Sequence, residues 1–238
     1  MQNYYKNKFG RVELPFNNNV VGLSMSGGAD STMLCYLLAK FLPNVIIQPI
    51  NGFDLNAPGD SNKLPKIIEY IRNDFKDVQI KWPLSTVFSN NNTVSVKQDY
   101  LRPLKTTALA YGLCDIMLSG ITMGPPIEHQ QRFNTFDNMA SEYGQNIKRI
   151  KGYNQYGDEV LYDLYDEVKD GGPFSEVDKR FVIQCYKDFD KEDLLNMTDS
   201  CVAFNVCNDT SKKPSELQDR KCWWCCERDW AVREVNNA

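Results

Sequence analysis

Residues 21–41, VGLSMSGGADSTMLCYLLAKF, contain the pattern that decides the fold. An apolar run over residues 20–26 predicts a buried strand, and residues 31–41 predict a helix that is apolar almost all round. Between them, two glycines let an anion approach the backbone amides, and the helix N-terminus adds a positive dipole and unpaired N–H groups. The stretch therefore predicts a phosphate-holding loop at the carboxyl edge of a sheet.

The rest of the chain continues the alternation of strands and helices. Further strands are predicted over residues 45–50, 78–84 and 114–120, with helices over 63–75 and 100–113. This order predicts an α/β fold with a doubly wound, mostly parallel sheet and helices on both faces. The polar, glycine-studded residues 124–172 predict an irregular insertion with helical pieces, and residues 173–198 predict a helix or two.

The composition of the chain argues against several classes of protein. The chain has 238 residues, 42% of them hydrophobic, and a net charge of −4. The acidic balance argues against a large nucleic-acid footprint. The N-terminal residues lack the apolar segment of a signal peptide, and no apolar run approaches the roughly 18 residues of a membrane span. We therefore expect a cytoplasmic protein without a membrane partner.

The loop contains no lysine, and this absence bears on its chemistry. A Gly-Lys-Ser/Thr loop holds the β- and γ-phosphates during γ-phosphoryl transfer. Here Asp30 or Ser31 is expected to cap the helix, and the hydroxyls of Ser26, Ser31 and Thr32 are expected to act as donors. The alternative is an incidental glycine turn between a strand and a helix.

Residues 26–31, SGGADS, resemble the signature of the PP-loop ATP pyrophosphatases. The resemblance implies an adenine nucleotide alpha hydrolase-like, Rossmann-like fold. In that family the loop grips the β,γ-pyrophosphate while a substrate oxygen attacks the α-phosphorus. The loop would thus stabilise a leaving group rather than position a transferred phosphoryl group.

The C-terminal cysteines form a second pattern. Cys222 and Cys225 have the two-residue gap of a metal knuckle, and Cys201 with Cys207 supplies a second pair. Four thiolates in a reducing compartment suit a structural, tetrahedral Zn²⁺. Cys226 is an alternative ligand, and free buried thiols or a redox pair are the alternatives to a metal. A catalytic zinc is disfavoured because the only imidazole, His129, is distant in sequence.

Together the two motifs resemble the 7-cyano-7-deazaguanine (preQ0) synthases of queuosine biosynthesis. Residues 198–201 (TDSC) match the family's T-x-S-C element, and Cys225 followed by Arg228 matches its end. The 15-residue separation of Cys207 and Cys222 is wider than in that family, which indicates a divergent relative, such as a viral or defence-associated one. The resemblance divides the chain into a PP-loop domain (1–123), a substrate-side insertion (124–172) and a zinc-bound helical segment (173–238).

The resemblance also implies a reaction. ATP adenylates a substrate carboxylate and releases pyrophosphate, and ammonia then displaces AMP to give an amide. In the full synthase reaction a second ATP leads to the nitrile. The implied partners are a deazapurine carboxylate and ammonia, and a homodimer is expected. Mg²⁺ is an implied cofactor, and holding it is the alternative to a capping role for Asp30.

The implied reaction needs positive groups that neutralise charge on the pyrophosphate and the α-phosphate, so basic residues are candidates for the site. Arg102 and Lys105, expected at the start of the fourth helix, and Lys179 are the basic candidates, and a solvated surface charge is the alternative for each of them. Adenine and ribose are expected near residues 49–53. The catalytic candidates are Asp30, Ser31, Arg102, Lys105 and Lys179; the nucleotide-binding candidates are Ser24, Ser26, Gly27, Gly28, Ala29, Asp30, Ser31, Thr32, Asn51, Phe53 and Gly120.

Two other functions stay open at this point. One is a PP-loop enzyme that modifies tRNA by lysidine formation or thiolation, although the chain lacks a basic RNA-binding appendage. The other is a non-catalytic adenine-nucleotide-binding module with a zinc-stabilised tail. His129 could serve as an acid or base, or could simply be exposed.

Overall fold

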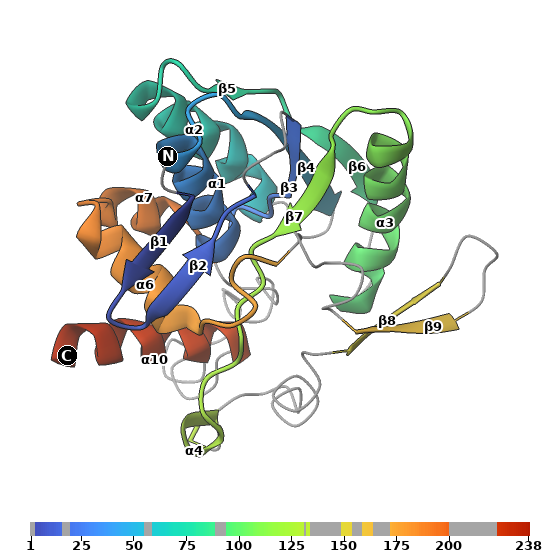
Figure 1. Ribbon diagram of the computed structural model, residues 1–238. Coiled ribbons are helices and arrows are strands. Elements are labelled where there is room, and N and C mark those ends of the chain that lie inside the picture. The colour runs from blue at the N-terminus through green and yellow to red at the C-terminus, as the bar shows by residue number, and fades with distance from the viewer. Residues whose placement is uncertain are drawn as a thin grey trace.

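The structure is a computed structural model, and its central feature is a parallel β-sheet with helices on both faces (Figure 1). It describes residues 3–15, 20–54, 59–88, 94–130, 132–133, 149–153, 159–163, 172–199 and 223–238.

The strand order of the sheet places one strand at its centre. β3 (Val20–Ser24) pairs in parallel with β4 (Ile46–Asp54) on one side and with β7 (Ile116–Ser119) on the other. The far edge of β4 pairs with β5 (Gln79–Ile80) and then with β6 (Leu84–Phe88), again in parallel. The strands that follow β3 in sequence, β4 to β6, thus lie on one side of it, and the chain then crosses over to place β7 on its other side. The order reverses between β3 and β7, which is the switch point where open α/β sheets bind ligands.

The third predicted strand is split in two. β5 ends at Ile80 and β6 begins at Leu84, so the single strand predicted over residues 78–84 is wrong in its detail. Pro83 lies in the gap, and proline has no N–H to donate to a sheet ladder. The gap is bridged instead by the side chain of Gln48, whose Nε2 donates to the carbonyl oxygen of Trp82 at 2.9 Å.

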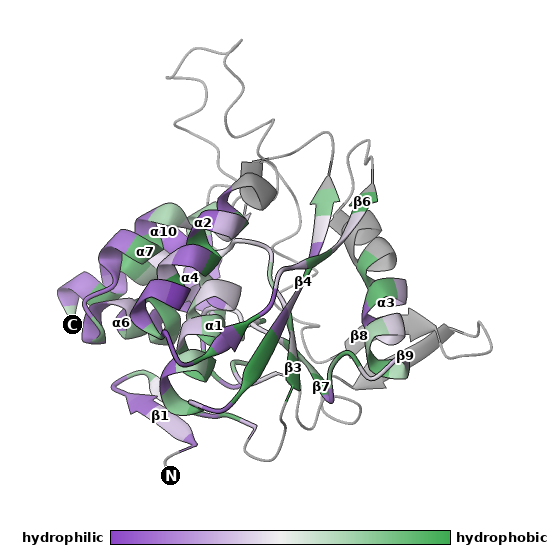
Figure 2. Ribbon diagram, turned by 90° about the horizontal axis from the view of Figure 1, so that it is seen from above, coloured by the Kyte–Doolittle hydropathy of each residue, from purple (hydrophilic) through white to green (hydrophobic). Residues whose placement is uncertain are grey.

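The helices enclose the sheet unequally. α1 (Ala29–Phe41) and α2 (Gly59–Asp74) lie on one face with three C-terminal helices, whereas α3 (Val94–Ala110) lies on the other (Figures 1 and 2). α1 is buried nearly throughout because it packs between the sheet and α6, which confirms its predicted all-round apolarity. The C-terminal helices are α6 (Lys179–Asp188), α7 (Glu192–Met197) and α10 (Trp223–Asn237).

Two antiparallel hairpins were not predicted from the sequence. β1 (Tyr4–Asn7) pairs with β2 (Gly10–Glu13) near α6, where the ring of Tyr5 contacts Phe181 and Phe189. The second hairpin lies within the expected insertion, which also contains the short helix α4 (Ile127–Gln130). Its strands are β8 (Arg149–Tyr153) and β9 (Glu159–Asp163).

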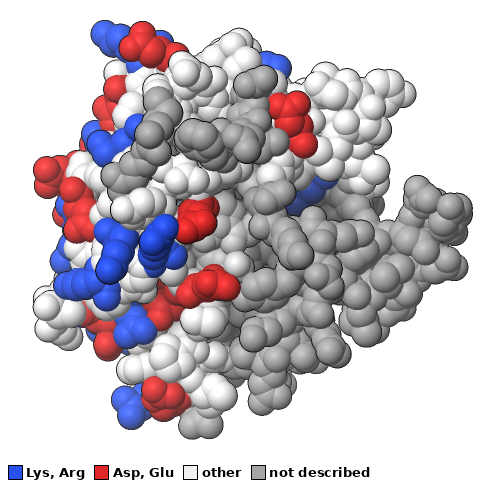
Figure 3. Space-filling model, viewed as in Figure 1, with Lys and Arg blue, Asp and Glu red and all other residues white. Residues whose placement is uncertain are grey.

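The outer surface carries charges of both signs on the side of the C-terminal helices. In the view of Figure 3, basic and acidic side chains are intermixed where β1, β2, α6, α7 and α10 lie. Within the described ranges, no helix has the length and hydrophobicity that a bilayer crossing needs.

Candidate nucleotide-binding site

The glycine loop leaves the sheet at the switch point. The amide of Met25 donates to the carbonyl oxygen of Ile50 at 2.9 Å, and the chain then turns through Gly27, whose φ of +86° is rarely adopted by other residues. α1 begins at Ala29 with Gly28 as its N-cap, and no side chain caps it. The expectation that Asp30 or Ser31 caps the helix is therefore wrong. The absence of a side-chain cap leaves the first-turn amides suited to an anion.

The predicted hydroxyl donors hold the loop in shape. The Oγ atom of Ser26 accepts from the amide of Gly28 at 3.3 Å. The Oγ atom of Ser31 accepts from the amide of Ser26 at 3.3 Å and donates to the carbonyl oxygen of Gly28 at 3.3 Å. Thr32 is fully buried, so its hydroxyl does not face solvent. Ser26 and Ser31 thus preorganise the loop, as a rigid anion site requires.

Gly120 lies across the switch point from this loop, at the end of β7. A Cβ atom at this position would lie 2.8 Å from the carbonyl carbon of Asp30 and 2.8 Å from the amide nitrogen of Ser31. Both atoms belong to the backbone, so they could not move aside without shifting α1. The structure therefore brings Gly120 and the start of α1 together, and it explains why a glycine is needed there.

The predicted adenine-side residues lie on an extension of β4. This strand continues to Asp54, beyond the predicted end at residue 50, and it passes beside the loop where β3 has already ended. Asn51 is 4% exposed and Phe53 is half-buried. Because side chains alternate along a strand, both residues lie on the face opposite to Ile50.

A buried charge cluster lies behind the loop. The Nζ atom of Lys179 contacts the Oδ2 atom of Asp30, and it lies 3.5 Å from the Oε2 atom of Glu227 in α10. Lys179 and Glu227 side chains are each only 3% exposed. Burial raises the pKa of Glu227 to about 7, although Lys179 opposes this shift. Burial lowers the pKa of Lys179, but the two carboxylates outweigh burial and leave it raised.

Lys179 is therefore a buried ion-pair partner rather than a solvated charge. Its ammonium is engaged by two carboxylates, so in this state it is not directed at a phosphate. Asp30 keeps its Oδ1 atom buried and without a hydrogen-bond partner among the described residues. Lysine at this position thus fixes the orientation of the Asp30 carboxylate in the first turn of α1.

Residues 198–199, from the predicted T-x-S-C element, contact the glycine loop directly. The amide of Asp199 donates to the carbonyl oxygen of Gly27 at 3.2 Å. The side chain of Asp199 pairs with Lys63 of α2, with 3.2 Å between Nζ and Oδ2. Arg228 donates to the carbonyl oxygens of Thr198 at 3.0 Å and Leu195 at 2.9 Å, which holds this segment against α10. Sequence analysis included Asp199 only as the variable position of the T-x-S-C element, and it missed Lys63 and Glu227, because no local pattern indicates contacts between such distant segments.

Arg102 and Lys105 do not lie where they were expected. α3 begins at Val94 instead of near residue 100, so Arg102 lies at its midpoint and Lys105 in its second half, roughly 12 and 16 Å along the axis from the helix start. The side chain of Arg102 is outside the described residues. Lys105 is half-buried, and burial lowers its pKa. Their contact with phosphate remains a prediction.

The structure describes only part of the predicted zinc site. Cys225 and Cys226 lie in the first turn of α10, both half-buried, whereas Cys201, Cys207 and Cys222 lie outside the described residues. The positive end of a helix dipole favours a thiolate ligand, so the position of Cys225 fits a metal site. Among the described residues, no three metal-ligating side chains come together.

The other cysteines and the single histidine have structural surroundings. Cys35 and Cys114 are buried in the core as expected, and burial raises the pKa of each thiol. The His129 ring lies 5.3 Å from the ring of Trp230 in α10. His129 is half-buried, so the expectation of a simply exposed residue is wrong.

Comparisons with known proteins give fold likenesses only. No family model matches the chain. No curated protein matches it either. Among solved structures, it is similar to the U34-tRNA thiolase NcsA from Methanococcus maripaludis with its 4Fe–4S cluster, at 13% identity and a TM-score of 0.47, covering 95% of this chain and 75% of that one. It is also similar to NMN synthetase from Francisella tularensis, at 14% identity and a TM-score of 0.42, covering 93% and 87%.

Proposed function

We propose that this protein is an ATP-dependent enzyme of the PP-loop type that cleaves ATP to AMP and pyrophosphate. The observation that carries the proposal is the SGGADS loop, which lies at the switch point between β3 and β7 and leads into an uncapped helix N-terminus. The amides there suit the charge that develops on a departing pyrophosphate. The lack of a loop lysine favours this role over γ-phosphoryl transfer.

The chain's own residues would orient the reaction. The bonds of Ser26 and Ser31 hold the loop rigid, so little reorganisation would accompany charge development. Mg²⁺ suits the Oδ1 atom of Asp30, where it would neutralise phosphate charge. Asn51 and Phe53 lie beside the loop on β4, and that position suits contacts with the adenosine portion.

We further propose that the activated group is a carboxylate of the deazapurine type, 7-carboxy-7-deazaguanine being the first candidate. The support is the resemblance of residues 198–201 and of the C-terminal cysteines to the deazaguanine synthases. Asp199 bonds to Gly27, and Arg228 bonds to Thr198, so residues 198–199 connect α10 to the glycine loop. Ammonia would displace AMP from the acyl adenylate to give an amide, and a second ATP would permit conversion to the nitrile.

The proposed zinc is structural. Cys201, Cys207, Cys222 and Cys225 would hold it and tie residues 200–222 to the start of α10. A site of four thiolates leaves no open coordination position, so the metal would stabilise the fold without touching the substrate.

A turnover assay tests the proposal. Zinc-loaded protein is incubated with Mg·ATP, ammonium and 7-carboxy-7-deazaguanine, while AMP, pyrophosphate and product mass are followed. AMP formation with an amide or nitrile product is the expected result, and the mass shows where the reaction stops. AMP at the level of the control without 7-carboxy-7-deazaguanine would eliminate this substrate. Failure to bind ATP or pyrophosphate would eliminate the ATP chemistry as well.

A further inference from the structure

We propose that Lys63 supplies the phosphate-binding lysine that the loop itself lacks, and that Asp199 holds it in reserve until nucleotide binds. The inference rests on the proposed function, since it concerns the same pyrophosphate site. It adds a residue that lies 35 positions after Gly28, the second glycine of the loop, and outside the sequence motifs described above.

The position of Lys63 follows from a chain of short contacts. Its Nζ atom lies 3.2 Å from the Oδ2 atom of Asp199, and the amide of Asp199 lies 3.2 Å from the carbonyl oxygen of Gly27. The carbonyl oxygen of Asp199 would lie 3.1 Å from a Cβ atom built on Gly28. Asp199 thus contacts the ammonium of Lys63 through its side chain and lies against Gly27 and Gly28 through its backbone.

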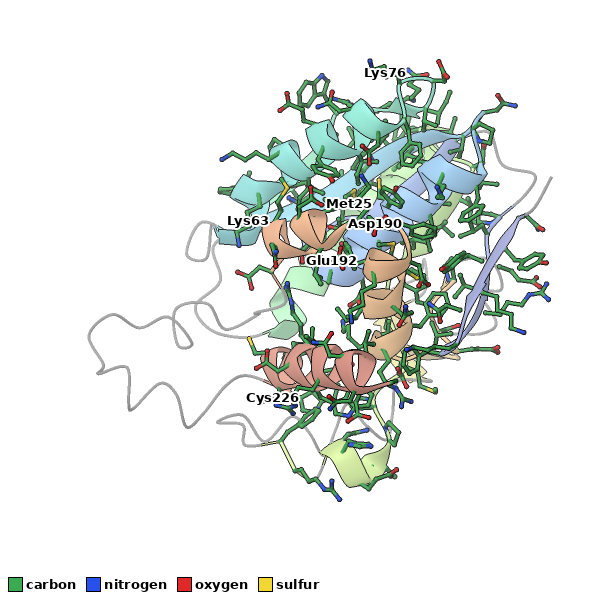
Figure 4. All side chains as sticks on the ribbon, turned by 90° about the vertical axis from the view of Figure 1, so that its left-hand side faces the viewer. Met25, Lys63, Lys76, Asp190, Glu192 and Cys226 are labelled. Carbon is green, nitrogen blue, oxygen red and sulfur yellow. The ribbon has the colours of Figure 1, made fainter. Side chains whose placement is uncertain are left out.

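The lysine side chain is more exposed than its partner, whose backbone is bonded to the loop. The Lys63 side chain is 40% exposed, against 22% for Asp199. Asp199 is anchored through its amide, and Arg228 fixes the carbonyl oxygen of the preceding residue. Figure 4 shows Lys63 near the start of α2 and beside α7, on the same side of the molecule as Cys226 at the start of α10. A flexible ammonium beside an anchored carboxylate can exchange that partner for a nearby anion.

Charge favours the exchange once nucleotide is present. A phosphate group offers a larger negative charge and more acceptor oxygens than one carboxylate, and bonds between ionised groups are the stronger ones. Without nucleotide, the pair with Asp199 keeps the ammonium beside the loop. With nucleotide, Lys63 would bind the pyrophosphate portion and the carboxylate of Asp199 would be released.

The test is calorimetric binding of inorganic pyrophosphate and of Mg·ATP to the full, zinc-loaded chain. Lys63→Ala is expected to weaken both affinities roughly tenfold to hundredfold, the range for loss of a charge-assisted hydrogen bond. Lys63→Arg should retain most of the affinity because it keeps the charge. Lys66→Ala is the matched control, since Lys66 is an exposed lysine on the same helix, and it should change affinity less than twofold.

The Asp199→Asn variant tests whether Asp199 competes with phosphate for Lys63 or supports the structure through the ion pair. This substitution keeps the backbone bond to Gly27 but removes the competing charge, so pyrophosphate should bind a few-fold more tightly. Equal affinities for Lys63→Ala and Lys66→Ala would overturn the inference while leaving the proposed function intact. Weaker binding by Asp199→Asn would also overturn it, because the pair would then be a structural support. A wild-type chain that binds neither probe would overturn both proposals.

Discussion

The ammonium of Lys179 contacts the carboxylate of Asp30, and this contact joins the first residue of α6 to the first turn of α1 across 149 positions of sequence. Glu227 of α10 lies on the other side of the same ammonium, so three helices meet at one buried positive charge. The C-terminal helix is thereby connected to the phosphate loop. The position of the loop therefore depends on the packing of α10, although no local sequence pattern associates the two segments.

Replacing Lys179 by methionine should destabilise the fold strongly. It leaves the buried carboxylate of Glu227 and the partly exposed carboxylate of Asp30 without their counter-ion. Removing one partner of a buried ion pair typically costs about 3–5 kcal/mol. Urea unfolding followed by circular dichroism measures the loss. Lys76→Met, at an exposed position after α2 (Figure 4), is the control for loss of one lysine charge. Similar stability of the two variants would contradict the importance of the cluster.

A second substitution shows whether the uncompensated charge causes that loss. Adding Glu227→Gln to Lys179→Met removes one of the two unpaired carboxylates. The double variant should therefore recover part of the lost stability. The gain would come from removal of an unpaired charge, since neither substitution adds a contact. A double variant less stable than Lys179→Met would instead indicate that packing of Glu227 dominates.

The two glycines that border the site should respond differently to alanine. Gly120→Ala places a methyl group against the backbone of α1, so we expect about 1–3 kcal/mol of destabilisation and a displaced loop. Gly28→Ala would place its methyl group 3.1 Å from the backbone oxygen of Asp199 and 3.2 Å from the Oγ atom of Ser26, at an ordinary negative φ. These contacts are tight but longer than those at Gly120, so the loss of stability should be smaller than for Gly120→Ala. Gly28→Ala should nevertheless weaken pyrophosphate binding, because the methyl group lies on the loop.

Thermal unfolding and pyrophosphate titration of both variants separate these effects. The expected pattern is a larger fall in Tm for Gly120→Ala than for Gly28→Ala, together with weaker pyrophosphate binding by Gly28→Ala. Equal melting temperatures would show that β7 and α1 can separate without cost, against the close approach described above.

Local patterns predicted the sheet and its loop well. The run from Val20 to Phe41 combines an apolar strand, two glycines and an apolar helix, and the order of these features alone specifies a βα unit. The alternation of elements likewise indicated parallel strands. The split between β5 and β6 was signalled by Pro83, yet its consequence depends on the side chain of Gln48 from a neighbouring strand.

Contacts between distant segments could not be predicted in this way. Asp199 and Lys63 are 136 positions apart, and neither the T-x-S-C element nor the residues around Lys63 indicate that the two side chains pair. Arg102 and Lys105 were misplaced because the polar residues before them gave no apolar repeat to mark the start of α3. The predicted functions of Cys201, Cys207 and Cys222 stay predictions, since these residues lie outside the part of the chain that the structure describes.

Lys105 should make the free energy of unfolding depend on pH in the alkaline range. Burial lowers its pKa from 10.5, so between the lowered value and 10.5 the unfolded chain binds more protons than the folded one. Stability contributed at this site therefore rises with pH across that interval. Lys105→Met removes the cost of the buried charge, so it should be more stable than wild type at neutral pH. The advantage should shrink as pH approaches 10.5, which urea unfolding at several pH values would detect. An advantage that does not vary with pH would mean that packing, rather than charge burial, causes it.

Zinc content should distinguish the two adjacent cysteines of α10. Consecutive helical residues project about 100° apart, so Cys225 and Cys226 cannot occupy equivalent positions around one metal ion. We expect one zinc per chain in wild type, its loss in Cys225→Ser and its retention in Cys226→Ser, measured by elemental analysis of the purified proteins. Removing the metal with a chelator should lower the Tm of wild type and Cys226→Ser alike, because metal binding contributes to folding. Metal loss confined to Cys226→Ser would assign Cys226 as the ligand in place of Cys225, and full metal content in both variants would exclude a site of four thiolates that includes either residue.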